Sequence, residues 1–221
     1  MTEIIKINPN RPSPTVIKKV SEIIKKGGLV VLPTDTVYGL ACDATNPVAV
    51  AKVFFIKKRP VSQPLSIAVA DFKHIYKYVG NITDSAKKLA KKFLPGPITL
   101  VLKKSSIIPD VVTSGRDDIG IRVPDCKIVL MLINALKKPI VIPSANLHKH
   151  PSPTTTQQAL KQLAGKVDLI LDGGKTKYGI ESTIVSCIDN KIKILRVGAI
   201  STKQILTSLE RRKNYKETRN P

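Results

Sequence analysis

The stretch 27-GGLVVLPTDTVYG-39 decides the fold class. Residues 29–32 are apolar at every position, which is typical of a strand buried on both faces. Before this run, Val and Ile recur at helical spacing over residues 14–26, with Pro14 in the first turn. Gly27 and the glycine after it end that helix. The sequence therefore predicts a buried strand that packs between helices.

The same alternation continues along the chain. Further helices are predicted over residues 46–57, 83–93, 127–136 and 155–163, and a last one begins at the capping box of Ser201 and Gln204. Further strands are predicted over residues 65–69, 98–102, 119–123, 139–142, 167–171, 183–188 and 192–197. Strands that alternate with helices predict an α/β fold. The sheet should be mixed, because residues 189–190 form a hairpin-like turn between the last two strands.

Length and charge limit the organisation and the partners. The 221 residues suit one domain, which we expect over residues 1–210, followed by a charged, frayed tail over residues 211–221. Lys and Arg number 37 against 16 Asp and Glu, a formal net charge of +21. Such a field attracts nucleic acid, nucleotides or anionic lipid, although a Lys-rich proteome would give the same composition.

The three cysteines, Cys42, Cys126 and Cys187, are widely spaced and form no C-x-x-C or Cys/His cluster. They are expected to be reduced thiols in a cytoplasmic protein, with no structural metal site. No segment reaches the roughly 18 consecutive apolar residues of a membrane span, and the N-terminus lacks the apolar core of a signal peptide. Secretion and membrane insertion are therefore disfavoured.

Small polar residues collect where predicted strands end or begin. The segments are Thr34-Asp35-Thr36, Ser144-Ala145-Asn146, Asp172-Gly173-Gly174 and Glu181-Ser182-Thr183. Ligands of open α/β sheets bind in the crevice outside strand ends, where hydroxyls, amides and glycine backbone hold polar small molecules. Each segment alone is more typical of a turn. The four together predict a site.

The predicted site favours an anion. Five cations lie at or near element ends: Lys57, Arg59, Arg116, Arg122 and Arg196. Arg122 and Arg196 stand within apolar strands, where a guanidinium needs a partner. That partner is either a phosphate or carboxylate ligand, or an Asp in a buried structural pair. The sequence holds no G-x-x-x-x-G-K-[ST] and no G-x-G-x-x-G after a strand, so neither loop would hold a nucleotide.

Nucleophilic catalysis fits the sequence poorly. No G-x-S-x-G occurs, the histidines are His74, His148 and His150, and no neighbouring residue type lowers the pKa of Cys42. His148 and His150 either flank the site or lie in solvent. Catalysis would therefore depend on positioning and charge neutralisation, as in phosphoryl or nucleotidyl transfer.

A series of motifs resembles one family, the YrdC-like threonylcarbamoyl-AMP synthases. In chain order they are GGLVVLPTDTVYGLACDA, KKRPVSQPL, FLPGPITLVL, DIGIRVPD, PSAN, PSPTT, DGG, GIESTIV and ILRVGAI. The resemblance covers roughly residues 13–205. It implies a twisted open α/β sheet with helices packed on it, a basic concave face, and the short, single-domain form of the family.

The resemblance also implies an activity. The family makes L-threonylcarbamoyl-AMP and pyrophosphate from L-threonine, bicarbonate and ATP, with Mg²⁺. Downstream tRNA threonylcarbamoyl-transfer proteins use the product for the N6-threonylcarbamoyladenosine modification of tRNA at position 37. A cytoplasmic nucleotidyltransferase is therefore implied, with tRNA or other RNA as a further expected partner.

Roles for particular residues follow from the same resemblance. Lys57 and Arg59 would be catalytic and would contact the ATP phosphates. L-threonine would be held by Thr36, Arg122, Ser144 and Ser182. ATP would also be contacted by Gln63, Asp118, Asn146, Ser152 and Arg196.

The sequence departs from the family pattern at four places. Gln63 stands where Asn is frequent, Ala68 where His sometimes occurs, His148-Lys149 where Ser-Gly is usual, and Val197 where Pro is familiar. The first two lie by the implied pocket. Lys58, between the two implied phosphate ligands, is expected to face away and to be replaceable.

Three alternatives remain open from the sequence. One is a non-catalytic RNA- or ribosome-binding factor that uses the same basic face. Another is a YciO-type paralogue, although the pair Ser144 and Asn146 favours the synthase. The third is the related domain of hydrogenase-maturation carbamoyltransferases, which normally lies in a longer chain with zinc-finger-like cysteines.

Overall fold

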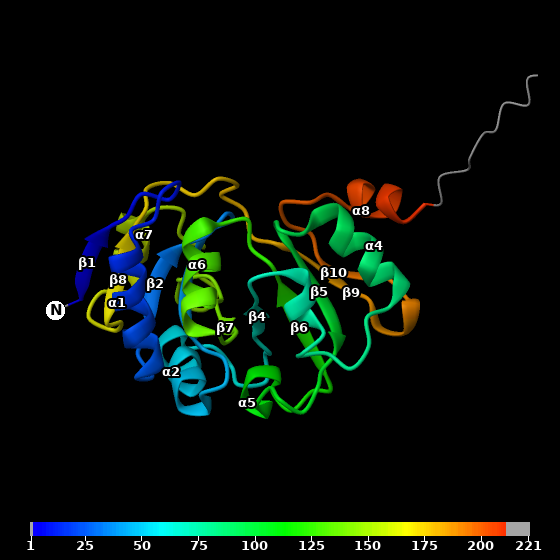
Figure 1. The fold of residues 1–221 in the computed structure, drawn as a ribbon, viewed down its shortest axis with the longest axis horizontal. Helices are drawn as coiled ribbons and strands as arrows, with labels where there is room; N and C mark the ends of the chain where they lie inside the picture. Colours follow the sequence, from blue (N-terminus) through cyan, green and yellow to red (C-terminus); the bar gives the residue numbers. More distant parts are fainter. Residues whose placement is uncertain (1, 211–221) are drawn as a thin grey trace, which may run out of the picture.

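Ten strands form one mixed sheet in the computed structural model, which describes residues 2–210 (Figure 1). In sheet order they are β1 (Glu3–Lys6), β8 (Leu169–Asp172), β2 (Val30–Pro33), β3 (Tyr38–Asp43), β7 (Ile140–Val141), β4 (Ser66–Ala68), β6 (Asp118–Arg122), β5 (Ile98–Lys103), β9 (Thr183–Ser186) and β10 (Lys193–Arg196). The pair β2–β8 is parallel, whereas β2–β3 is antiparallel. The predicted α/β class with a mixed sheet is confirmed. The predicted tail, residues 211–221, lies outside the described residues.

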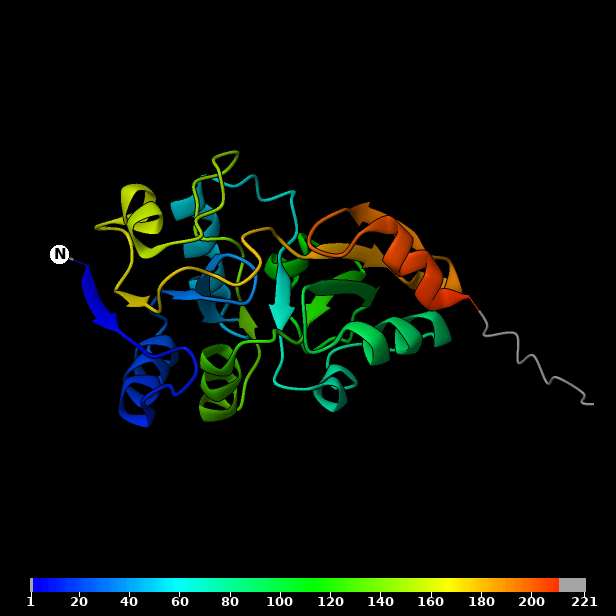
Figure 2. The same ribbon diagram turned by 90° about the horizontal axis from the view of Figure 1, so that it is seen from above.

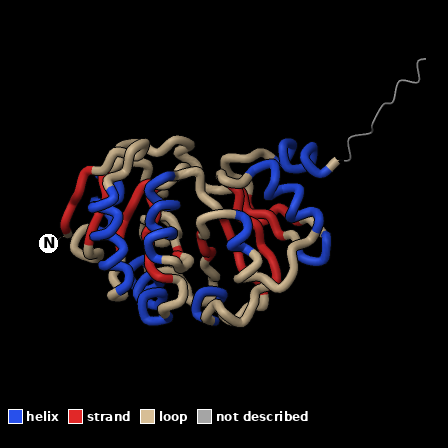
Figure 3. The backbone as a smooth tube through the Cα atoms, in the orientation of Figure 1, coloured by secondary structure: helices blue, strands red, loops and turns tan. Residues whose placement is uncertain are grey.

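Helices cover both faces of this sheet (Figures 2 and 3). They are α1 (Pro14–Lys25), α2 (Pro47–Lys57), α3 (Phe72–Ile75), α4 (Asp84–Phe93), α5 (Asp110–Thr113), α6 (Lys127–Leu136), α7 (Thr156–Leu163) and α8 (Thr202–Leu209). α1 and α6 pack together on one side, where α4 also lies, whereas α2 and α7 lie on the other side (Figure 2).

β2 is buried on both faces, as its apolar run predicts. Val30 and Leu32 belong to the same apolar core as Val20 of α1. Val31 points to the opposite side and joins the core that contains Val53 of α2. All five side chains are fully shielded from solvent. A strand that contributes to two cores cannot alternate apolar with polar residues, which explains the sequence pattern.

The sequence does not predict four of these elements, β1, β3, α3 and α5. β3 reads YGLACD, and its Gly and terminal Asp weaken the strand pattern, yet every position is buried because β2 and β7 flank it. β1 is a four-residue edge strand that pairs with β8, a segment far along the chain. The predicted hairpin between β9 and β10 is confirmed, with a 3-10 turn at Ile188–Asn190.

A tight turn over residues 34–37 joins β2 to β3. The Thr34 hydroxyl donates to the Val37 carbonyl (2.7 Å) and accepts from the Thr36 amide (3.1 Å). These side-chain bonds satisfy backbone groups that neither strand can pair. The turn therefore presents the Thr36 side chain at a fixed place beside the sheet.

The Tyr38 hydroxyl ties this turn to the segment that follows β8. It donates to the Gly174 carbonyl (2.7 Å), accepts from the Gly173 amide (3.3 Å), and lies 3.0 Å from Thr156 Oγ1. Tyr38 itself is fully buried, whereas Gly174 is exposed, so the hydroxyl reaches from the core to a loop at the surface.

The Tyr38→Phe substitution should lower the free energy of unfolding by about 1 kcal/mol, because the hydrogen bonds of this hydroxyl to Gly174 and Gly173 are lost. Chemical denaturation measures the change. As a matched control, Tyr76→Phe should change the unfolding free energy by less than about 0.5 kcal/mol, since Tyr76 is half exposed. Equal stability of the Tyr38 variant and the wild type would contradict the role given to this hydroxyl.

Candidate active site

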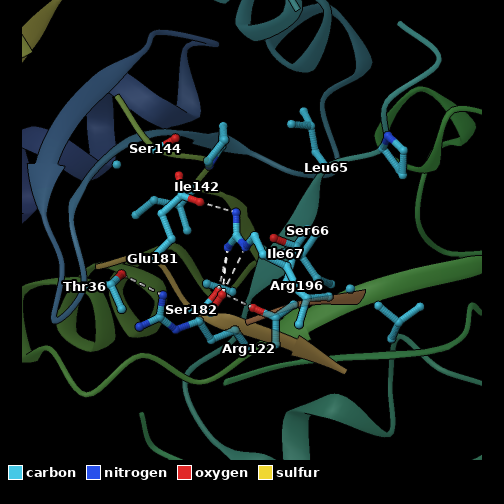
Figure 4. A pocket seen from close by; sticks show the side chains of 18 of the residues that line it. Thr36, Leu65, Ser66, Ile67, Arg122, Ile142, Ser144, Glu181, Ser182 and Arg196 are labelled. Carbon is cyan, nitrogen blue, oxygen red and sulfur yellow. Dashed lines mark hydrogen bonds and ion pairs between the residues drawn. The ribbon is translucent and has the colours of Figure 1, made fainter. Parts of the chain in front are cut away.

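A cavity of about 410 Å³ lies where the polar ends of several strands meet (Figure 4). Its polar lining residues are Thr34, Thr36, Tyr38, Arg59, Gln63, Ser66, Thr99, Arg116, Asp118, Arg122, Ser144, Glu181, Ser182 and Arg196. Three of the four polar segments that predicted a site contribute to this lining. The fourth, Asp172-Gly173-Gly174, does not, and its Gly173 amide and Gly174 carbonyl instead form hydrogen bonds with the Tyr38 hydroxyl.

The cavity gathers most of the predicted site residues. Eight of the eleven border it: Thr36, Arg59, Gln63, Asp118, Arg122, Ser144, Ser182 and Arg196. The other three, Lys57, Asn146 and Ser152, are hydrogen-bonded to lining residues or to one another. Residues that are distant in the sequence thus meet in one place.

Arg122, at the end of β6, is held by three acceptors. Its Nη2 donates to Asp35 Oδ1 (2.6 Å), its Nη1 to Thr36 Oγ1 (3.0 Å), and its Nε to the Gly96 carbonyl (3.0 Å). Burial lowers the pKa of the guanidinium, and the Asp35 carboxylate acts in the opposite direction. The sequence left two partners open for Arg122, an anionic ligand or a buried Asp, and in the structure Asp35 is that buried Asp. The side chain still borders the cavity, so it can also meet a ligand.

Arg196, at the end of β10, is fixed in a similar way. Its Nε and Nη2 donate to the Ser182 carbonyl (3.2 and 2.9 Å), and its Nη1 forms an ion pair with Glu181. Figure 4 shows the guanidinium between Glu181 and Ser182. The Ser182 hydroxyl lies 2.9 Å from that of Thr99. Both predicted strand arginines thus have acidic partners within the fold.

Arg59 differs from the other arginines of the cavity. Its Nε donates to the Gln63 carbonyl (3.1 Å) and its Nη2 to the Pro64 carbonyl (2.9 Å), and both acceptors are neutral. Arg116, in contrast, is paired twice with Asp118 (3.0 Å for both contacts). Within residues 2–210, no ion pair involves Arg59. Its positive charge is therefore available to an anionic ligand.

Lys57 differs from its predicted orientation toward the cavity. As the last residue of α2 it is 2% exposed, and its ammonium donates to the Ser144 carbonyl, the Asn146 carbonyl (2.6 Å) and Asn146 Oδ1 (3.3 Å). Burial, followed by the nearby Arg59 charge, lowers its pKa to about 8. In this structure Lys57 therefore anchors the segment 144–146, which offers two backbone carbonyls and the Asn146 side-chain oxygen as acceptors.

Lys58 ends α2 in the left-handed conformation, with φ 51°. It is exposed, as the sequence predicts. The left-handed turn separates the direction of Lys57 from that of Arg59, so two neighbouring cations serve different parts of the site.

Asp35, Thr99 and Glu181 contact predicted site residues, but the sequence assigns none of the three a role of its own. Asp35 and Glu181 belong to two of the polar segments at strand ends. They could have been predicted as the acidic partners that Arg122 and Arg196 need within apolar strands. Thr99 interrupts the apolar strand ITLVLK, and a buried hydroxyl there also needs a partner.

The cysteines are poorly suited to thiol chemistry. The three cysteines are free, and burial raises the pKa of Cys42 and Cys187 to about 12, so neither thiol is reactive near neutral pH.

Within residues 2–210 no three His, Cys, Asp or Glu side chains group as a metal site. Among the same residues, no helix is long and apolar enough to span a membrane.

Comparison with known proteins identifies the family of this chain. A Sua5/YciO/YrdC family model, described as "Telomere recombination", matches residues 22–198. The chain belongs to the Sua5/YciO/YrdC family. The threonylcarbamoyl-AMP synthase of Pyrococcus abyssi is 39% identical over 205 residues, which are 93% of this chain and 60% of that protein. A member from Methanocaldococcus jannaschii is 44% identical over 192 residues, 85% of this chain and 90% of that protein.

Solved structures of the Sua5/YciO/YrdC family share this fold. Pyrococcus abyssi Sua5 in complex with L-threonine superposes with a TM-score of 0.90 at 38% identity, over 94% of this chain and 61% of that one. Escherichia coli YciO gives 0.85 at 26% identity, over 93% and 100%. The chain spans about 60% of the length of the Pyrococcus protein.

The departures from the family pattern lie close to the site. Gln63 and Ala68 both border the cavity. Lys149, where glycine is usual, has φ 65°, a conformation that glycine adopts more easily. The neighbouring His148 is half-buried, and this burial, followed by the charges of Arg59, Lys149 and Lys57, lowers its pKa and so disfavours its charged form. His148 is therefore a poor anion ligand.

The anchoring role of Lys57 is testable by Lys57→Met. The free energy of unfolding at pH 7 should fall by about 1–3 kcal/mol, because two buried carbonyls lose their donor. The pKa of Lys57 is about 8 in the folded protein and lies below the ordinary value of 10.5. Between pH 8 and pH 10.5, Lys57 is therefore mostly protonated in the unfolded chain and mostly neutral in the folded protein. The stability advantage of the wild type should therefore grow as pH rises from 8 to 10.5.

The control is Lys58→Met at the exposed neighbouring position, which should stay within about 0.5 kcal/mol of the wild type. Denaturation curves at several pH values provide the measurement. A Lys57 variant as stable as the wild type that has lost ATP binding would show that Lys57 contacts phosphate instead.

Proposed function

We propose that this protein synthesises L-threonylcarbamoyl-AMP from L-threonine, bicarbonate and ATP, with release of pyrophosphate. The observation that carries the proposal is the cavity, in which a fixed Arg122 and a second guanidinium without an acidic partner, that of Arg59, face the same space. The names of the family relatives, and the L-threonine in the similar Pyrococcus structure, support this choice.

L-threonine is proposed to bind at Arg122. The guanidinium is oriented by Asp35 and by the Thr36 hydroxyl, so its remaining surface suits a carboxylate. The Ser144 and Ser182 hydroxyls, in the same lining, supply polar contacts for the amine or the side chain of the amino acid. Ala68 leaves space at this wall.

ATP is proposed to bind at Arg59 and Arg196, with Gln63 and Asp118 in the same lining and Ser152 beside Glu181. In this account Asn146 and Lys57 shape the wall and need not touch phosphate. Asp118 keeps Arg116 in place, so a nucleotide contact by Asp118 competes with that pair.

The chemistry consists of two steps. The threonine amine and bicarbonate form a carbamate with loss of water. A carbamate oxygen then attacks the α-phosphorus, one phosphorus–oxygen bond forms, and the bond to the departing pyrophosphate breaks. Negative charge spreads over the phosphate oxygens in this step, and Arg59 and Arg196 are positioned to stabilise it. The second step uses no protein nucleophile.

Mg²⁺ is proposed to enter as part of the ATP substrate. Residues 2–210 contain no group of carboxylates, histidines or cysteines that would hold the ion unaided. Mg²⁺ commonly binds through substrate phosphates with few protein ligands, which fits such a lining. When bound, it would neutralise part of the phosphate charge.

The product is proposed to serve tRNA modification in the cytoplasm. Downstream transfer proteins would place the threonylcarbamoyl group on N6 of adenosine 37 of tRNA. The excess of Lys and Arg gives the protein a field that attracts RNA, so direct tRNA contact is included in the proposal.

The proposed activity is tested by pyrophosphate release from ATP and Mg²⁺. Release should require both L-threonine and bicarbonate, and Arg59→Ala should lower the rate about 100- to 1000-fold, because a preorganised cation is lost. Arg11→Ala, at an exposed arginine outside the cavity, is the matched control and should retain the full rate.

Folded protein that releases no pyrophosphate in response to L-threonine would refute the synthase proposal. If the same protein bound tRNA tightly, with strong salt dependence and no turnover, the RNA-binding alternative would replace it.

A further inference from the structure

Glu181 stands between two residues that the proposed function places near ATP. Its Oε1 accepts a hydrogen bond from the Ser152 hydroxyl (2.6 Å), and its Oε2 pairs with Arg196 Nη1. The carboxylate lines the cavity, and one third of the side chain is exposed (Figure 4). It is thus an anion already present inside a cavity that favours anions.

Arg196 does not need Glu181 to stay in place. Its Nε and Nη2 are both held by the Ser182 carbonyl, which leaves Nη1 as the edge that faces the carboxylate. A phosphate oxygen binds a guanidinium edge with the same geometry as a carboxylate oxygen. Glu181 therefore occupies the contact that a phosphate group would use.

The influence of Glu181 extends to the other cations of the site. Its charge opposes the lowering of the pKa of Lys57 and of Arg59 that burial causes. The carboxylate thus balances three cations of the ligand-free cavity. A phosphate that reached these cations would meet repulsion from Glu181, since two anions cannot share so small a space at low cost.

The main chain at Glu181 is fixed, whereas its side chain can turn. The Glu181 carbonyl accepts from the Ala199 amide (2.9 Å), and a Cβ on Gly198 would come within 2.1 Å of the same carbonyl oxygen. The main chains of Glu181 and Gly198 therefore pack directly against each other, and this packing and the Ala199 hydrogen bond hold the backbone in place. Any response to a ligand must therefore come from rotation of the partly exposed side chain.

We propose that Glu181 is an internal competitor of the nucleotide phosphates: its carboxylate occupies the Arg196 and Ser152 contacts in the ligand-free protein and turns away when ATP binds. This inference rests on the proposed use of Arg196 and Ser152 for ATP. Glu181 then limits the affinity for polyphosphate, and its return to Arg196 favours the departure of pyrophosphate. It is a positioning residue and does not act on the reacting atoms.

The test compares Glu181→Gln with the wild type by calorimetric titration of ATP, pyrophosphate and adenosine, with and without Mg²⁺. The variant keeps the shape and loses the charge. It should bind ATP and pyrophosphate about three- to tenfold more tightly at low salt, in line with the strength of a partly exposed ion pair. Adenosine affinity should not change, and the difference should shrink at high salt.

Two further variants make the outcome specific. Glu22→Gln makes the same change of charge on α1, where Glu22 pairs with Lys25 (2.9 Å), and should leave all affinities unchanged. Glu181→Asp keeps the negative charge in the cavity. Its affinity for pyrophosphate should therefore stay within about twofold of the wild-type affinity.

Three results would overturn the inference. One is a Glu181→Gln variant that binds pyrophosphate equally or more weakly than the wild type. Another is a loss of affinity confined to the Mg²⁺-loaded ligands, which would make Glu181 a metal ligand. The third is a wild type that binds neither ATP nor pyrophosphate, which would also refute the proposed function. Tighter polyphosphate binding by the variant without threonine-dependent turnover would support the inference and refute only the synthase activity.

Discussion

The ion pair between Arg122 and Asp35 is the interaction on which the site depends. It joins the end of β6 to the turn between β2 and β3, and the Asp35 side chain is completely buried. Breaking such a pair on one side costs about 3–5 kcal/mol, because a charge remains in the interior. The pair therefore fixes Arg122 and Thr36 relative to each other before any ligand arrives. The proposed binding of a carboxylate at Arg122 rests on this preorganisation.

The cations in and around the cavity differ in their hydrogen-bond and ion-pair partners, a difference that the sequence alone does not reveal. Lys57 is used by the fold, since it anchors the backbone of residues 144–146. Arg122 and Arg196 are held by internal carboxylates, and Arg59 by neutral carbonyls alone. A ligand phosphate would therefore meet Arg59, which forms no ion pair within residues 2–210, and Arg196, which an internal carboxylate already contacts. The proposed division of the cavity into an amino-acid side and a nucleotide side rests on this inequality.

Much of the fold could be predicted from the sequence, because the apolar run at residues 29–32 and the helix caps are local signals. β3 could not, since its burial is imposed by β2 and β7 and its own pattern is weak. Most of the cavity lining was named in advance from the polar strand ends and the resemblance. The direction of the Lys57 side chain could not be predicted. The carbonyls that accept hydrogen bonds from its ammonium belong to residues 144–146, which are distant in the sequence and come close only in the fold.

Calorimetric titration with L-threonine and with L-threoninol tests the central claim most directly. The two ligands differ in that threoninol lacks the carboxylate that Arg122 is proposed to bind. The account predicts that L-threonine binds and that L-threoninol binds about 100-fold more weakly or not at all, since the oriented guanidinium loses its charged partner. Equal affinity for the two compounds would contradict the claim that the Arg122–Asp35 pair builds a carboxylate site.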